Sequence, residues 1–69
     1  MKILLTGGTG GLGREVVRAA EAAGHTVRIA SRRARPDDAP PAREWARTDL
    51  EAGTGLREAL DGVDAVVHA

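Results

Sequence analysis

The residues best suited to chemistry in this sequence form a glycine-rich run near the amino terminus. The run spans residues 6–13 and reads Thr-Gly-Gly-Thr-Gly-Gly-Leu-Gly. Glycine leaves main-chain N–H groups uncovered and adopts backbone angles that side chains forbid, so a charged ligand can approach the chain closely. Glycines at positions 7, 10 and 13 suit a strand-to-helix turn: the first makes the turn, the second admits a phosphate, and the third lets the helix pack on the sheet. The spacing therefore predicts a diphosphate site at the amino terminus of a helix.

Two other interpretations of this run involve different proteins or no ligand at all. Gly8 and Gly13 have the spacing of a P-loop, which requires Lys and then Ser or Thr for the phosphate charge and the magnesium ion. Arg14 and Glu15 follow instead, so a nucleotide triphosphatase of that type is disfavoured. A turn that only lets the helix pack, with no ligand, is the remaining alternative.

The elements that must position this turn can be predicted from the pattern of apolar residues. Ile3 to Leu5 is a short apolar run that predicts a buried strand, and residues 12–23 have helical periodicity that ends at Gly24. We expect one face of this helix to pack on the sheet through Leu12, Val16, Ala19 or Ala20, and Ala23. We expect the opposite face to carry the charged residues Arg14, Arg18 and Glu21.

The rest of the chain predicts three more strands and one short helix. The strands are expected at residues 26–30, at 44–47, where Trp45 would anchor the strand, and at 63–68. The helix is expected at 56–60, with Thr54 as a possible cap and Gly62 as the stop. All three prolines lie between residues 32 and 42, which predicts a loop without a helix.

This order of elements predicts an α/β fold, a doubly wound parallel sheet of the Rossmann type with four strands in the order 3-2-1-4. Residues 1–69 would be the amino-terminal half of such a dinucleotide-binding domain, truncated after the fourth strand. The last strand would then be an apolar edge, through which two copies of the chain could associate.

Composition excludes several other classes of function. The 69 residues carry ten acidic and ten basic side chains, and Trp45 is the only aromatic residue, which argues against nucleic acid and an anionic membrane surface as partners. Cysteine is absent and the two histidines are far apart in sequence, so no metal site is expected. The sequence has no apolar run long enough to span a membrane and no secretory pattern, so we expect a cytoplasmic protein.

Four segments resemble the short-chain dehydrogenase/reductase superfamily, in its extended and atypical (NmrA-like) branches. Residues 6–13 match the turn T-G-x-x-G-x-[LI]-G of that superfamily. Residues 24–33 are similar to its second strand with the residues that follow, residues 49–50 to the Asp-Leu pair after its third strand, and residues 62–69 to its fourth strand.

The resemblance implies a nicotinamide dinucleotide as the cofactor and suggests which residues bind it. The implied residues are Thr6, Gly7, Thr9, Gly10, Gly11, Leu12, Gly13, Ser31, Arg32, Arg33, Asp49, Leu50, His68 and Ala69. NADP is favoured over NAD, because Ser31 stands where an NAD site has a carboxylate for the ribose hydroxyls, and arginines can bind a 2′-phosphate.

Several of these residues also have a purely structural interpretation. Arg32 and Arg33 could form a solvated basic loop, and Asp49 could cap the next turn rather than bind adenine. His68 could simply end a strand, and the hydroxyl of Thr9 could bond within the turn.

The resemblance also indicates what the chain lacks. The usual catalytic pair of the superfamily is Tyr-x-x-x-Lys, but tyrosine is absent and Lys2 is the only lysine, so no catalytic residue is assigned. We expect the amino-terminal part of an NADP-dependent oxidoreductase or a nucleotide-sugar-epimerase-like enzyme. The alternatives are a non-catalytic NADP-binding redox sensor and an inactive gene fragment.

Overall fold

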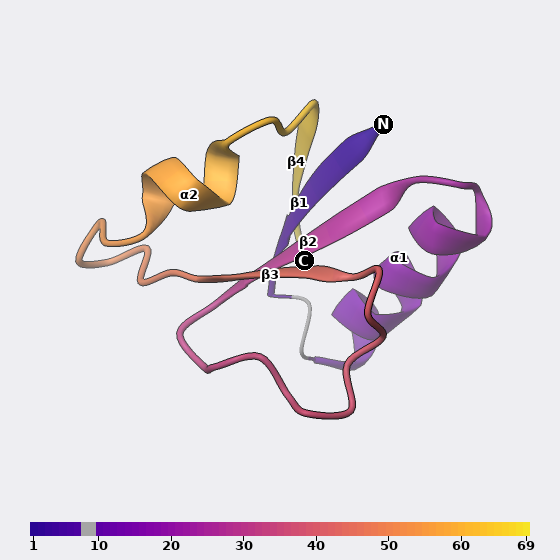
Figure 1. The fold of residues 1–69 in the computed structure, drawn as a ribbon, viewed down its shortest axis with the longest axis horizontal. Coiled ribbons are helices and arrows are strands. Elements are labelled where there is room, and N and C mark those ends of the chain that lie inside the picture. Colours follow the sequence, from indigo (N-terminus) through magenta and orange to yellow (C-terminus); the bar gives the residue numbers. More distant parts are fainter. Residues whose placement is uncertain (8–9) are drawn as a thin grey trace.

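The fold is an open parallel sheet with one helix on each face, as Figure 1 shows. The computed structural model describes residues 1–7 and 10–69. Its elements are β1 (Lys2–Thr6), α1 (Gly11–Ala22), β2 (Thr26–Ser31), β3 (Glu44–Arg47), α2 (Leu56–Leu60) and β4 (Ala65–His68). All three strand pairs are parallel and the order is β3-β2-β1-β4. The predicted fold class and strand order are confirmed.

Alternate residues of the strands supply two small cores, one on each face of the sheet. Leu5 lies level with Ile29 of β2 and with Val67 of β4, and these side chains pack with Val17 of α1. On the other face, the buried residues are Leu4, Ala30, Ala46 and, from α2, Ala59. Because side chains alternate across a strand, each helix covers its own set of strand residues.

The buried face of α1 agrees with the predicted one in part: Val16 and Ala20 pack against the core as expected, but Leu12 does not. Gly13 and Val17 are the buried residues of the helix, whereas Leu12 is 70% exposed. Since Gly13 lies against the sheet, Leu12, one position earlier in the first turn, is directed to solvent. Glu21, expected on a solvated face, is instead held by Arg43 at 2.7 Å.

The connection between β2 and β3 is a loop, as the prolines predicted. Residues 32–43 contain no helix. The guanidinium of Arg35 donates to the carbonyls of Arg43, Pro40 and Ala39, at 2.5, 2.7 and 3.4 Å. These bonds fix the course of the loop where other parallel folds have a helix.

Two local predictions near the carboxyl terminus are wrong. Gly55, not Thr54, is the residue before α2; it has a φ of 78°, and no side chain caps the helix. A Cβ at Gly55 would collide with the carbonyl of Arg47, so the close approach of this turn to β3 requires glycine. β4 begins at Ala65 rather than at Val63, and the carboxylate of Asp64 accepts the N–H of Lys2 at 2.7 Å.

Neither helix among the described residues is long and apolar enough to cross a membrane.

Candidate functional site

The carboxyl ends of the four strands meet at one edge of the sheet, beside a cavity of about 400 Å³. The chain leaves β1 toward β2 on one side and reaches β4 on the other, so the strand order reverses next to β1. Ligands of open α/β sheets bind in the crevice at this reversal. The cavity brings together predicted site residues from four segments: Thr6, Gly7, Ser31, Arg32, Arg33, Asp49, Leu50 and His68.

Gly7 makes the turn out of β1 in the left-handed conformation, with a φ of 77°. A Cβ on this residue would collide with the carbonyl oxygen of Ala69. Ala69 is held there because its N–H donates to the carbonyl of Thr6 at 3.0 Å. The predicted sharp turn at Gly7 is confirmed, and Ala69 borders it.

The amino terminus of α1 presents bare main chain. Gly10 precedes the helix, and no side chain of residues 1–7 or 10–69 caps it. A Cβ at Gly10 or at Gly11 would meet no atom of the described residues within 4 Å, so the described part of the chain leaves open space beside both residues. The first N–H groups of a helix have no partner within it, and the helix dipole makes this end electropositive. Gly8 and the predicted site residue Thr9 lie outside the described residues.

Thr6 and His68 join the ends of the two central strands. The hydroxyl of Thr6 and Nδ1 of His68 are 2.5 Å apart, and Thr6 is buried. The Thr6 hydroxyl is therefore engaged with the neighbouring strand. His68 borders the cavity with its ring tied to β1.

The residues after β2 are held by bonds to their main chain. The N–H of Arg33 donates to the hydroxyl of Ser31 at 3.1 Å. The carbonyl of Arg32 accepts from Nε of Arg47 at 2.9 Å, and the carbonyl of Arg33 accepts from the indole of Trp45 at 2.8 Å. The side chains of Arg32 and Arg33 are exposed and form no ion pair with any residue in 1–7 or 10–69. Hydrogen bonds thus fix the main chain of these two residues, while both guanidinium groups remain able to bind a ligand.

Comparison with known proteins identifies the group to which this arrangement belongs. The model of the NAD dependent epimerase/dehydratase family matches residues 3–69. The chain belongs to this family. It is 40% identical over 73 residues to the photosystem II assembly factor Ycf39 of Synechocystis, and 34% identical over 68 residues to an uncharacterised protein of Mycobacterium tuberculosis. It spans 22% of the first relative and 8% of the second.

Two solved structures support the same assignment. UDP-N-acetylglucosamine 4-epimerase from Bacillus cereus matches all of the chain with a TM-score of 0.74 and 38% identity. A short-chain dehydrogenase/reductase superfamily protein from Agrobacterium tumefaciens, solved with bound NAD, matches all of it with a TM-score of 0.77 and 39% identity. The chain covers 22% and 20% of these proteins. The resemblance to the short-chain dehydrogenase/reductase superfamily is confirmed.

In this epimerase/dehydratase family member, Asp49 has a clear structural role. Its Oδ1 accepts the N–H groups of Glu51 and Ala52 at 3.0 and 3.2 Å, which is the turn-capping arrangement considered for it above. Leu50 is 55% exposed at the rim of the cavity. A ring entering the cavity would therefore meet an apolar side chain next to a carboxylate whose Oδ2 accepts no bond among the described residues.

A network around Arg28, which was not predicted from the sequence, supports the sheet. Arg28 of β2 donates to the carbonyls of Glu58, Ala59 and Asp61 at the end of α2, at 2.9, 2.8 and 2.7 Å. Glu44 accepts from Arg28 at 2.8 Å and from Lys2 at 3.0 Å. The hydrogen bonds from Lys2 and then Arg28 lower the pKa of Glu44 below its ordinary value. The one sign of this network in the sequence is a charged residue, Arg28, in the middle of a largely apolar strand.

Proposed function

We propose that this chain binds NADP(H), with the pyrophosphate over the glycine-rich turn and the amino terminus of α1. The observation that carries the proposal is the open main chain at Gly10 and Gly11, next to the turn at Gly7 and at the reversal of the strand order. Uncapped N–H groups and the helix dipole favour a doubly charged diphosphate at this position. When bound, the nicotinamide supplies the capacity to accept or donate a hydride.

The adenosine half of the cofactor would occupy the cavity of about 400 Å³ between the loops after β2 and β3. Leu50 would flank the adenine ring, and Oδ2 of Asp49 is the oxygen left for its amino group. Because Oδ1 of Asp49 already holds the turn of residues 49–52, the carboxylate is fixed before the ligand arrives.

The preference for NADP rests on the residues after β2. A carboxylate at position 31 would repel a 2′-phosphate, but the residue is Ser31, and its hydroxyl accepts the N–H of Arg33. Arginine binds phosphate through paired charge-assisted hydrogen bonds. The backbone of Arg32 and Arg33 is fixed by Arg47 and Trp45, which supports these two side chains as readers of the phosphate.

The titration of the full chain with NADPH tests this proposal, with Trp45 fluorescence and unfolding temperature as readouts. Gly10→Ala should weaken NADPH binding by about tenfold, which equals about 1.4 kcal/mol, because a methyl group enters the space of the pyrophosphate. Gly24→Ala is the matched control, since its surroundings are equally open but it lies at the other end of α1; the NADPH affinity of this variant should stay within about threefold of wild type. Equal NADPH affinity of Gly10→Ala and wild type, both folded, would refute the site.

The reaction of the longer relatives is a separate part of the proposal. We infer that the chain supplies the amino-terminal half of the dinucleotide-binding domain in an oxidoreductase or nucleotide-sugar-epimerase-like enzyme, as its similarity to the UDP-N-acetylglucosamine 4-epimerase suggests. Its similarity to an assembly factor, Ycf39, favours a non-catalytic NADP-binding role as the second candidate. Both candidates require NADPH binding by this chain, and neither assigns it a catalytic residue.

A further inference from the structure

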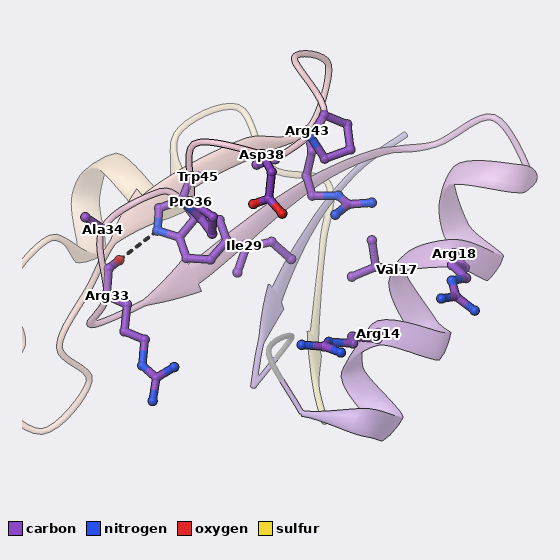
Figure 2. A pocket seen from close by; sticks show the side chains of 12 residues that line it. Arg14, Val17, Arg18, Ile29, Arg33, Ala34, Pro36, Asp38, Arg43 and Trp45 are labelled. Carbon is purple, nitrogen blue, oxygen red and sulfur yellow. Dashed lines mark hydrogen bonds between the residues drawn. The ribbon is translucent and has the colours of Figure 1, made fainter.

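A second cavity lies on the α1 face of the sheet. This groove has a volume of about 460 Å³ and runs between α1 and the loop of residues 33–43 (Figure 2). Val17 and Ile29 are buried beneath it and Trp45 is half-buried beside them. The groove exists because the connection from β2 to β3 has no helix to cover this part of the sheet.

The walls of the groove are held by several bonds. The loop wall is braced by Arg35, which donates to the carbonyls of three loop residues. Arg43 joins the end of the loop to α1 through two bonds to Glu21, at 2.9 and 2.7 Å. The indole of Trp45 donates to the carbonyl of Arg33 at 2.8 Å, the bond drawn in Figure 2. A groove with fixed walls loses little entropy when a ligand binds.

The charged residues around the groove are mainly basic. Its lining includes Arg14, Arg18, Arg33 and Arg43, with Asp38 as the acidic residue among them, although the whole chain carries no net charge. Arg43 is committed to Glu21, and Figure 2 shows Arg18 directed away from the groove.

Arg14 and Asp38 remain as the two charged groups able to select a ligand. Figure 2 shows both directed into the space above Val17 and Ile29, one from α1 and the other from the loop. Neither side chain has a hydrogen bond or an ion pair with any residue that the structure describes. A ligand would therefore meet a cation on one wall, a carboxylate on the other and apolar side chains below.

We propose that this groove is a second binding site, for a small flat aromatic acid that carries an amino or hydroxyl donor. The acid group would pair with Arg14, the ring would lie over Val17 and Ile29 next to Trp45, and the donor would bond to Asp38. The volume is within the range of small-molecule sites. The site is distinct from the proposed NADP(H) cavity, although Arg33 borders both.

The test uses para-aminobenzoate as the probe and the indole N–H signal of Trp45, the one tryptophan, as the NMR readout on the full chain. Benzoate lacks the donor and aniline lacks the acid, so the expected order of affinity is para-aminobenzoate, then benzoate, then aniline. Arg14→Gln should lower the affinity for para-aminobenzoate by about fivefold. Arg57→Gln, at an exposed position of α2, is its matched control and should leave the affinity for para-aminobenzoate unchanged.

Asp38→Asn should abolish most of the difference in affinity between para-aminobenzoate and benzoate. Asp37 lies next to Asp38 but does not line the groove, so Asp37→Asn should preserve this difference. Saturating NADPH should leave the probe bound. Displacement of the probe by NADPH would overturn the proposal by making the groove part of the cofactor site, as would equal effects at Asp37 and Asp38 or no saturable shift. Probe binding without NADPH binding would support this groove and refute the proposed function.

Discussion

The carbonyl group of Ala69 lies against Gly7, at the position where a side chain on that glycine would begin. The contact arises because the N–H of Ala69 bonds to the carbonyl of Thr6, which brings the end of β4 next to the turn that leaves β1. The turn is thus closed on one side by main chain, and only a residue without a Cβ fits there.

Gly7→Ala should therefore destabilise the chain more than a substitution that only disturbs a left-handed backbone. Gly24→Ala is the matched control, because Gly24 has a φ of 89° but open space around it. We expect a loss of about 1 kcal/mol for Gly24→Ala and about 2–3 kcal/mol for Gly7→Ala, measured by urea unfolding. Similar losses at both positions would mean that the end of β4 moves aside easily.

The double variant Ser31→Asp, Arg32→Ala should change the choice of cofactor. It introduces a carboxylate that repels a 2′-phosphate and removes one guanidinium that would bind it. We expect NADPH affinity to fall by at least about tenfold more than NADH affinity in parallel titrations. Arg57→Ala serves as the control for loss of a positive charge elsewhere. Equal losses for the two cofactors would show that Ser31 and Arg32 do not read the phosphate.

Arg28→Gln should destabilise the fold because it frees three carbonyls at the end of α2 and leaves Glu44 with Lys2 alone. Hydrogen bonds from a charged donor contribute about 1.5–3 kcal/mol each in favourable cases, and we expect a total loss of about 2 kcal/mol. Urea unfolding measures the loss, and amide hydrogen exchange should show α2 opening first. An unchanged unfolding midpoint, as expected for Arg57→Gln, would contradict this role of Arg28.

Acid should weaken the fold through Glu21 and Glu44. The hydrogen bond from Arg43 lowers the pKa of Glu21, and the bonds from Lys2 and Arg28 lower the pKa of Glu44, both from an ordinary value of 4.5. A carboxylate with a lowered folded pKa stabilises the fold above its unfolded pKa, and this contribution is lost as the pH falls through the folded pKa. The unfolding free energy should therefore decrease from about pH 5 downward.

Glu44→Gln and Glu21→Gln test this dependence directly. Each variant should be less stable than wild type near neutral pH, and the difference should shrink as the pH falls below the ordinary pKa. Glu51→Gln is the control, since the exposed Glu51 side chain forms no ion pair with any described residue. A difference that stays constant across the acid range would exclude these carboxylates as its cause.

The elements that the sequence predicted well are those with strong local signals. Apolar runs, prolines and glycines predicted the strands, the helix at Leu56–Leu60 and the loop of residues 32–43, and parallel connections then restricted the strand order. The sharp turn at Gly7 was predictable because a turn from a strand into a helix requires glycine at fixed spacing.

The predictions that failed depended on contacts between distant segments. Thr54 is a reasonable cap by residue type, but the close approach of Gly55 to Arg47 determines how the chain enters α2. Arg28 donates to main-chain carbonyls thirty or more positions away. Because every residue has a main-chain carbonyl, the residue types at those positions do not reveal these bonds. The groove between α1 and the loop of residues 33–43 likewise follows from how the loop lies over the sheet, which the spacing of residues alone does not reveal.

The brace formed by Arg35 has a consequence for degradation. A protease must draw an extended stretch of substrate into its cleft, and exposed irregular segments are usually where it succeeds. Residues 35–43 are irregular but curled around one guanidinium, so cutting there requires three bonds to open together. The segment that looks most vulnerable in the sequence should thus survive until the whole fold opens, and replacing Arg35 alone should make it the first place cut.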